Sequence, residues 1–515
     1  MAFVFAHPSS GPNPEKLLLA GGGMMLAALT FVAGLWLFTG DYGRSYPYIF
    51  ILPWMLALAA IVAAPAVYYF LHGGLPLHNP IIFAAWSYFF PSFVVGGFAV
   101  AFGLSQPYFL SFVQDSANDL PFTILLAGLG YAALASGFML SPGRRIGRSV
   151  SRYLPDREYT LNSLIVPGLI LLFSGLINSA FAFVMGVIGY QKVAEIGQFD
   201  GIIFLTTLFW MQGSFLLWYI LFKRGSVDPV AVLIAAALLS TSLGRALFAG
   251  NRGSLLQLFV IVSFAFLLAG GRVTFKRTVA GGLVLGFCLM AGMLYGTTFR
   301  DIKGSQEQVG LDTYTESIFD TFDRVGHSDN SSNLAFAFAN LSERLDGVSS
   351  LAVVASNYEA LAPYEESYGL NNNIWNDITT FFIPRVIWPN KPVASDPRAY
   401  SDLYFNYADN SFTITPIGDL LRNYGVIGVA IGMFILGLLL RIVYGALIEG
   451  QPVVSWRATL YFMLIINLSY EGFYGTIVPY MFKVGATTLV GILFVNFFAR
   501  RIDVWPGLST LPPRK

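Results

Sequence analysis

Charged residues are scarce in this chain. They make up 11% of its 515 residues, whereas soluble proteins carry roughly 25%. Cysteine is scarcer still: Cys288 stands alone, which excludes an intramolecular disulfide and a cysteine metal cluster. The net charge of +1 gives no reason to expect a nucleic-acid partner. What the sequence has instead is hydrophobic residues, 55% of the total, and this balance favours an integral membrane protein.

The hydrophobic residues gather in runs long enough to cross a bilayer. A spanning helix needs about 20 apolar residues, and in lipid it must satisfy its own backbone hydrogen bonds. The first run lacks a clear small-residue cleavage site, so we interpret it as a retained helix and not a signal peptide. We predict an all-α integral membrane protein with about 12 transmembrane helices, near residues 17–39, 47–71, 80–103, 120–140, 161–187, 201–222, 229–249, 253–270, 278–299, 424–446, 456–476 and 477–499.

One long connection divides the predicted helices. Residues 1–299 hold helices 1–9, residues 300–423 form a large loop with catalytic and substrate-binding elements, and residues 424–515 hold helices 10–12 and a tail. Within the loop, residues 333–358 have an apolar stripe at spacings of four and three. We expect an amphipathic helix there that packs on the spanning helices or lies at the membrane interface.

Positive charges predict the orientation. Arginines and lysines concentrate in the short loops after helices 4, 6 and 8 and in the C-terminal tail, and cytoplasmic loops are the ones enriched in these residues. Both termini are therefore predicted to be cytoplasmic and the large loop external. In a bacterium the protein would lie in the inner membrane, with this loop in the periplasm.

Several cations lie on the predicted external side, although Lys and Arg are normally enriched on the cytoplasmic side. Planar guanidinium groups bind phosphate through paired donors, so several arginines suit a diphosphate. The alternative is that some pair with Asp301, Asp346 or Asp419, or reach lipid phosphates. The candidate diphosphate-binding residues are Arg245, Arg252, Arg300, Arg344, Arg385, Lys391 and Arg422.

The most distinctive motif surrounds Arg385. Pro384-Arg-Val-Ile-Trp-Pro-Asn-Lys-Pro392 contains three prolines, which stiffen the loop that carries Arg385 and Lys391. The alternative interpretation is an interfacial loop anchored by aromatic residues.

This motif resembles the oligosaccharide repeat-unit polymerases of the O-antigen polymerase type, as do the segments 416–428 and 250–253. The resemblance implies a C-type glycosyltransferase-like enzyme that works without metal or other cofactor. Its donor would be a growing glycan on undecaprenyl diphosphate and its acceptor one repeat unit on the same lipid. Membrane lipids and a chain-length regulator protein are the further partners that it suggests.

Such a transfer needs a base for the acceptor hydroxyl. The candidates are His327, Glu343 and Asp377, with Asp346 and Asp396 as rivals, and each could instead be a solvated charge or an arginine partner. A lipid-linked glycan ligase would share this architecture but use another acceptor. A transporter of lipid-linked sugars is the non-enzyme alternative, for which inverted repeats and midplane charges would be expected.

Overall fold

A computed structural model describes residues 46–504, with gaps at 73, 105–106, 190–196, 198, 251–252, 305–308, 328–344, 392–394, 409–410 and 450–452. The described chain is helical, and nine of its helices are long and apolar enough to cross a membrane. They are Ile49–Leu71 (mostly α2, Leu52–Leu71), Pro80–Ala101 (α3, Pro80–Ala84, a π-helical stretch, and α4, Gly96–Ala101), Ser116–Met139 (α6), Ile165–Val184 (α8), Asp200–Arg224 (α9), Pro229–Ala249 (α10), Lys276–Lys303 (within α12, Phe275–Lys303), Thr415–Leu447 (α18) and Tyr474–Ile502 (within α20, Tyr474–Val504).

Two predicted spans are shorter helices. The run at 253–270 forms α11 (Ser254–Leu268) and the run at 456–476 forms α19 (Ser455–Ile466). At 1.5 Å per residue, a helix of 12 residues such as α19 covers about 18 Å, less than a hydrocarbon core of about 30 Å. The predicted helix at 17–39 lies outside the described residues.

Local sequence explains where several helices begin and end. The Asp228 side chain accepts a hydrogen bond from the Ala231 amide at 2.7 Å, and Pro229 follows, so α10 starts with a cap. The helix ends at Gly250, whose φ of 61° few other residues adopt. A similar left-handed glycine, Gly425, with φ 66°, breaks α18 internally near the predicted start of its span.

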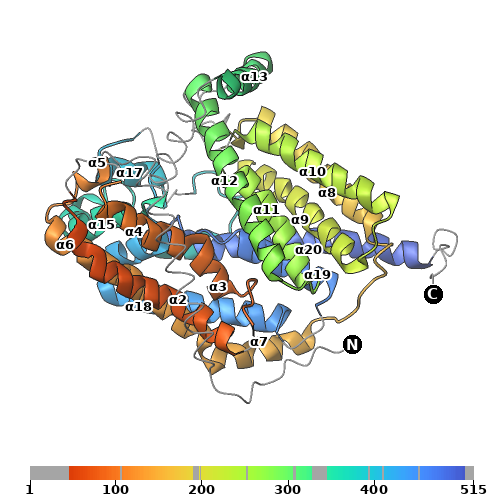
Figure 1. The fold of residues 1–515 in the computed structure, drawn as a ribbon, viewed down its shortest axis with the longest axis horizontal. Coiled ribbons are helices and arrows are strands. Elements are labelled where there is room, and N and C mark those ends of the chain that lie inside the picture. Colours follow the sequence, from red (N-terminus) through yellow and green to blue (C-terminus); the bar gives the residue numbers. More distant parts are fainter. Residues whose placement is uncertain are drawn as a thin grey trace.

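The helices pack in two groups that α20 joins. One group places α18 against α6, α7 (Ser141–Tyr153) and α15 (Gly347–Leu361), and the other packs α9 on α8, α11 and α19. In Figure 1, α20 runs between them, and it contacts α18, α8 and α9. A substrate site next to α20 would therefore lie near both groups.

Glycines let α6 and α18 touch through their backbones. A Cβ atom on Gly137 would lie 2.1 Å from the Phe434 carbonyl oxygen, and one on Gly437 would lie 2.0 Å from that of Leu134. Such small residues allow close helix contact in membranes, where apolar side chains gain little from leaving lipid.

The large loop is partly built into the helix bundle. Its helices are α13 (Leu311–His327), α15, α16 (Asn373–Thr380) and α17 (Pro397–Phe405), and α18 already starts at Thr415. Val348 and the residues 351–354 of α15 are fully buried, because α15 packs between α4, α6 and α18. The predicted stripe thus contributes to the protein interior at its C-terminal end; the residues 328–344 lie outside the described chain.

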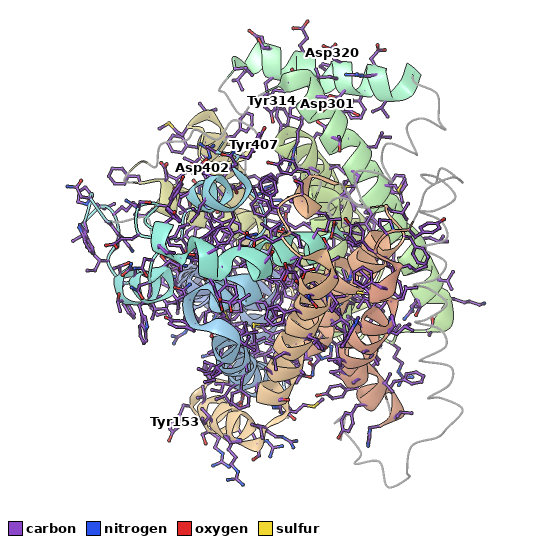
Figure 2. All side chains as sticks on the ribbon, turned by 90° about the vertical axis from the view of Figure 1, so that its left-hand side faces the viewer. Tyr153, Asp301, Tyr314, Asp320, Asp402 and Tyr407 are labelled. Carbon is purple, nitrogen blue, oxygen red and sulfur yellow. The ribbon has the colours of Figure 1, made fainter. Side chains whose placement is uncertain are left out.

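Opposite ends of the molecule carry different elements. Figure 2 shows Asp301, Tyr314 and Asp320, from α12 and α13, at one end and Tyr153 of α7 at the other. Asp402 and Tyr407, in and just after α17, lie toward the α13 end. The arginine-rich α7 therefore lies at the end of the molecule opposite α13.

Candidate functional site

A group of cations lies where α16 packs on α20. We call Arg385, Lys391 and Lys483 the α16–α20 cation cluster. The turn after α16 carries Arg385 and Lys391, and Phe381 in this turn packs on Phe482 of α20 with ring centroids 5.3 Å apart. The close approach begins at Gly475, where a Cβ would lie 2.9 Å from the Ile374 Cα. A glycine at the start of α20 thus lets the loop bring its cations to Lys483.

The cluster has more positive charge than its surroundings neutralise. Lys391 donates to the carbonyl oxygens of Thr380 at 2.7 Å and Ile383 at 3.3 Å, which fixes its ammonium group. Burial, and then the charges of Lys483 and Arg385, lower the pKa of Lys391. Neither Arg385 nor Lys483 forms an ion pair or side-chain hydrogen bond with another residue in the described ranges. An anion placed here would relieve this repulsion.

Asp377 lies beside the cluster on α16. Its Oδ2 accepts a hydrogen bond from the Ser395 hydroxyl, and Ser395 in turn accepts one from the Asn373 amide at 2.8 Å. Burial raises the pKa of Asp377, although Ser395 and the charge of Lys391 oppose that shift. A carboxylate with a raised pKa is a better proton acceptor than an ordinary surface aspartate.

Arg422 occupies a buried network on α18. It pairs with Glu365 and with Asp419, each at 2.8 Å, and donates to the Asn373 side-chain oxygen at 2.6 Å. Its side chain is fully buried. The ion pair with Asp419 is the alternative that the sequence offers for this arginine. Asn373 connects this network to Ser395 and so to Asp377.

Arg245 has a different environment, on α10. Its guanidinium carbon lies 4.3 Å from the ring centroid of Trp210, and its Nη1 donates to Gln257 at 3.4 Å. Gln257 contacts the Met211 sulfur, which the Asn467 amide also contacts at 3.8 Å. A chain of side chains therefore leads from Arg245 to the segment between α19 and α20.

The remaining predicted residues divide into those the structure describes and those it does not. Arg300 is half-buried on α12, near the end that precedes α13. His327 is the last residue of α13, and its side chain lies outside the described atoms. Arg252, Glu343 and Arg344 lie outside the described residues.

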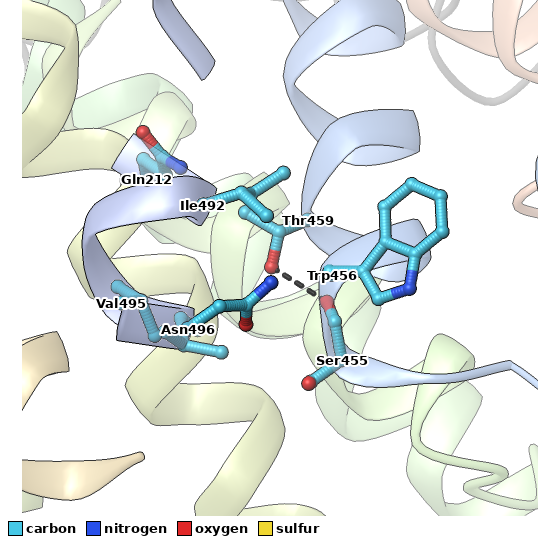
Figure 3. Close-up of a pocket in the computed structure, with 8 residues that line it drawn as sticks. Gln212, Ser455, Trp456, Thr459, Ile492, Val495 and Asn496 are labelled. Carbon is cyan, nitrogen blue, oxygen red and sulfur yellow. Dashed lines mark hydrogen bonds between the residues drawn. The ribbon is translucent and has the colours of Figure 1, made fainter. Parts of the chain in front are cut away.

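Two cavities lie along α20. The larger, of about 150 Å³, is lined by residues on both sides of the α19–α20 junction, and we call it the junction cavity: Asn467, Leu468, Ser469, Thr476, Ile477 and Tyr480. The other, between α9, α19 and α20, has a volume of about 10 Å³ and is lined partly by Gln212, Thr459 and Asn496 (Figure 3). The latter has room for one water molecule at most, so it is not a substrate site.

Our sequence analysis missed Lys483, Ser395 and Asn373. Lys483 could have been identified from the sequence, because a lone lysine inside an apolar run is costly in a membrane and is commonly functional. Ser395 and Asn373 give none, since their importance comes from a contact across 22 residues of loop.

The described residues form a helical membrane protein with nine helices long and apolar enough to cross a bilayer, and a cationic site lies beside one of these helices. More particularly, the chain belongs to the family described as domain of unknown function DUF8712, whose model matches residues 125–446. This match includes Asp377, Arg385 and Lys391 but ends before Lys483. No curated protein matches the chain. No solved structure matches it either.

Proposed function

We propose that this protein is a glycosyltransferase that polymerises undecaprenyl-diphosphate-linked oligosaccharide repeat units. In this proposal the chain crosses a bacterial inner membrane about twelve times, with both termini in the cytoplasm. The segment 300–423 and the start of α20 then face the periplasm. The product would be an O-antigen, capsule or exopolysaccharide chain, and no cofactor is needed.

The α16–α20 cation cluster carries the proposal. Three cations converge from two distant segments, and within the described chain Arg385 and Lys483 form no ion pair or side-chain hydrogen bond, while Asp377 is the one carboxylate whose charge acts on Lys391 and Lys483. Such a group suits a ligand with two or more negative charges, because each cation repels the others until an anion binds. A lipid diphosphate supplies those charges at the membrane surface, where α16 and the start of α20 would lie.

The surroundings of the cluster also suit a lipid carrier. Phe382, Ile387 and Trp388 have exposed side chains in the same turn as Arg385. Aromatic side chains favour the headgroup level of a bilayer. A ligand with a diphosphate head and a polyprenyl tail could therefore place its head on the cations while its tail lies among apolar groups.

In the proposed reaction Asp377 acts as the base. The acceptor hydroxyl oxygen attacks the anomeric carbon of the donor sugar, with inversion, and the bond between that carbon and the diphosphate oxygen breaks. The bonding electrons leave with the lipid diphosphate, whose new charge Arg385 and Lys483 stabilise. The hydroxyl proton passes to Asp377, whose pKa is raised by burial.

The test uses purified protein in nanodiscs with undecaprenyl-diphosphate oligosaccharide as sole substrate. We expect a ladder of products on a gel, and Arg385→Ala should reduce it by about 10²- to 10³-fold because a fixed charge at the leaving group is lost. Arg398→Ala is the matched control, since Arg398 is an exposed arginine of α17 outside the cluster.

Three other outcomes would contradict the proposal. A ladder of normal intensity from Arg385→Ala would remove the cluster from the reaction. Product formed only when a lipid A core acceptor is added would identify a ligase. Movement of the lipid-linked sugar across a vesicle membrane, without new glycosidic bonds, would identify a transporter.

A further inference from the structure

The junction cavity is the feature that the proposed site leaves unused. Helix α19 stops at Ile466 and α20 starts at Tyr474, so the chain between them is not helical. Leu468, Tyr470 and Phe473 in this connection are buried while Ser469 is exposed, and both Leu468 and Ser469 line the cavity.

The polar groups that line this cavity retain hydrogen-bonding capacity. Tyr480 donates to the Asn467 oxygen at 3.4 Å, which leaves the tyrosine oxygen free to accept. The Ser469 oxygen accepts from the Glu471 amide at 3.3 Å, and its own proton has no acceptor in the described chain. Thr476 donates to the Phe473 carbonyl oxygen and keeps its acceptor sites. The lining therefore offers a donor and several acceptors but no charge.

A lining with hydrogen-bond donors and acceptors but no charge favours an uncharged ligand that carries hydroxyl groups. A phosphate or carboxylate would find no cation in the lining, whereas hydroxyl groups can both donate and accept. Leu468 and Ile477 add apolar surface, which suits the C–H faces of a ring. The cavity volume of about 150 Å³ is below the roughly 300–1,000 Å³ of drug-sized sites, so it suits a single ring and not a whole oligosaccharide.

The cavity also lies next to the cation cluster. Thr476, Tyr480 and Lys483 are spaced by four and three residues on α20, so they share one face of that helix. Lys483 follows Tyr480 by about 4.5 Å along the axis, given 1.5 Å per residue. A sugar attached to a diphosphate could thus occupy the cavity while its phosphates lie on Lys483.

We propose that the junction cavity binds one uncharged sugar ring of the lipid-linked glycan. This inference rests on the proposed function, because it places the ring beside the diphosphate that the cluster would hold. Asn467, Ser469, Thr476 and Tyr480 would contact the ring hydroxyls, and the choice among sugars would come from this lining.

The experiment measures protection of an introduced thiol. Ser469→Cys, in a Cys288→Ser background, is reconstituted in nanodiscs and treated with a polar methanethiosulfonate reagent. A panel of methyl glycosides is expected to slow modification of the thiol, while glycerol and inorganic diphosphate do not. Ser367→Cys, on an exposed turn outside the cavity, is the matched control and should not be protected.

A second cysteine position and a variant expected to bind sugar more weakly complete the experiment. Thr476→Cys tests the opposite wall, so a folding defect in one variant does not remove the measurement. Tyr480→Phe, combined with Ser469→Cys, should raise the glycoside concentration for half protection by up to about tenfold, because one neutral hydrogen bond is lost. Equal modification rates with and without every glycoside at both reporters would overturn the inference and leave a cavity that holds water.

The outcomes separate this inference from the proposed function. If glycosides protect the thiol but the nanodisc assay gives no polymer ladder, the sugar site is supported and the proposed polymerisation is contradicted. If the assay gives a ladder but no glycoside protects the thiol, polymerisation is supported and the sugar site is contradicted.

Discussion

Arg422 and Arg385 are both predicted diphosphate-binding residues, yet their surroundings differ in burial and in the charges beside them. Arg422 is fully buried, with Glu365 and Asp419 each 2.8 Å away. Arg385 is half-buried on a turn, and the charges it interacts with include two other cations. In this molecule the charge of Arg422 is already neutralised by two carboxylates, whereas that of Arg385 is not, which makes Arg385 the better candidate for binding an anion.

The largest expected effect is the loss of stability on substituting Arg422, the buried arginine. Arg422→Ala leaves Glu365 and Asp419 buried without their partner, which should cost about 3–5 kcal/mol. We expect loss of the monodisperse protein after extraction, measured by size-exclusion chromatography and thermal unfolding. Replacing all three residues by neutral ones, as Arg422→Met with Glu365→Gln and Asp419→Asn, should recover part of the loss. Stable, fully folded Arg422→Ala protein would mean that the network is dispensable.

Next in size is the loss of the proposed base. Asp377→Asn keeps the shape of α16 but cannot accept a proton, so the polymerisation rate should fall by about 10²- to 10⁴-fold while the unfolding temperature changes little. Asp377→Glu should retain part of the rate. If Asp377→Asn is fully active, the base lies elsewhere, and His327 and Glu343 become the candidates to substitute.

Lys483→Ala should have a smaller effect, of about tenfold on kcat/KM, because Arg385 and Lys391 remain. The change should appear mainly in KM for the lipid-linked donor if Lys483 binds the diphosphate before the reaction. Thr487→Ala, one turn further along α20, is the control. An unchanged KM would confine the anion site to the turn after α16.

The smallest effect is a shift in pH dependence. The activity of a base falls as the pH drops through its pKa, and burial has raised the pKa of Asp377 above its ordinary value of about 3.9. The Ser395 hydroxyl lowers that pKa by its hydrogen bond to the carboxylate. Ser395→Ala should therefore move the acidic limb of the rate profile to higher pH. A shift in the opposite direction would exclude Asp377 as the titrating group.

Much of the fold follows from the hydrophobic runs. Eleven predicted spans fall in the described chain, and nine of those runs form helices long enough to cross a membrane. Of the two exceptions, α11 is a few residues shorter than its predicted run, and α19 ends at Ile466 although its predicted run continues to residue 476. Hydropathy cannot detect this, because an apolar residue in a non-helical connection such as 467–473 counts the same as one in a helix.

The site was less predictable, because it depends on pairings between distant residues. In the structure Arg385 and Lys391 of the 384–392 motif lie on the turn after α16, and Asp377 lies beside them. Nothing in the spacing showed that Glu365 would neutralise Arg422 or that Gly475 would bring α20 against α16. The prediction therefore treated seven cations as equivalent, although those that the structure describes have different environments.

The backbone contact between α6 and α18 has a consequence for synthesis. Gly137 and Gly437 are 300 residues apart, and at about 5–20 residues per second a ribosome needs roughly 15–60 s to make the chain between them. Throughout that time the glycine face of α6 has no partner helix and must be covered by lipid or by the insertion machinery. A ribosome that stalls within this stretch would leave the close contact between α6 and α18 unmade.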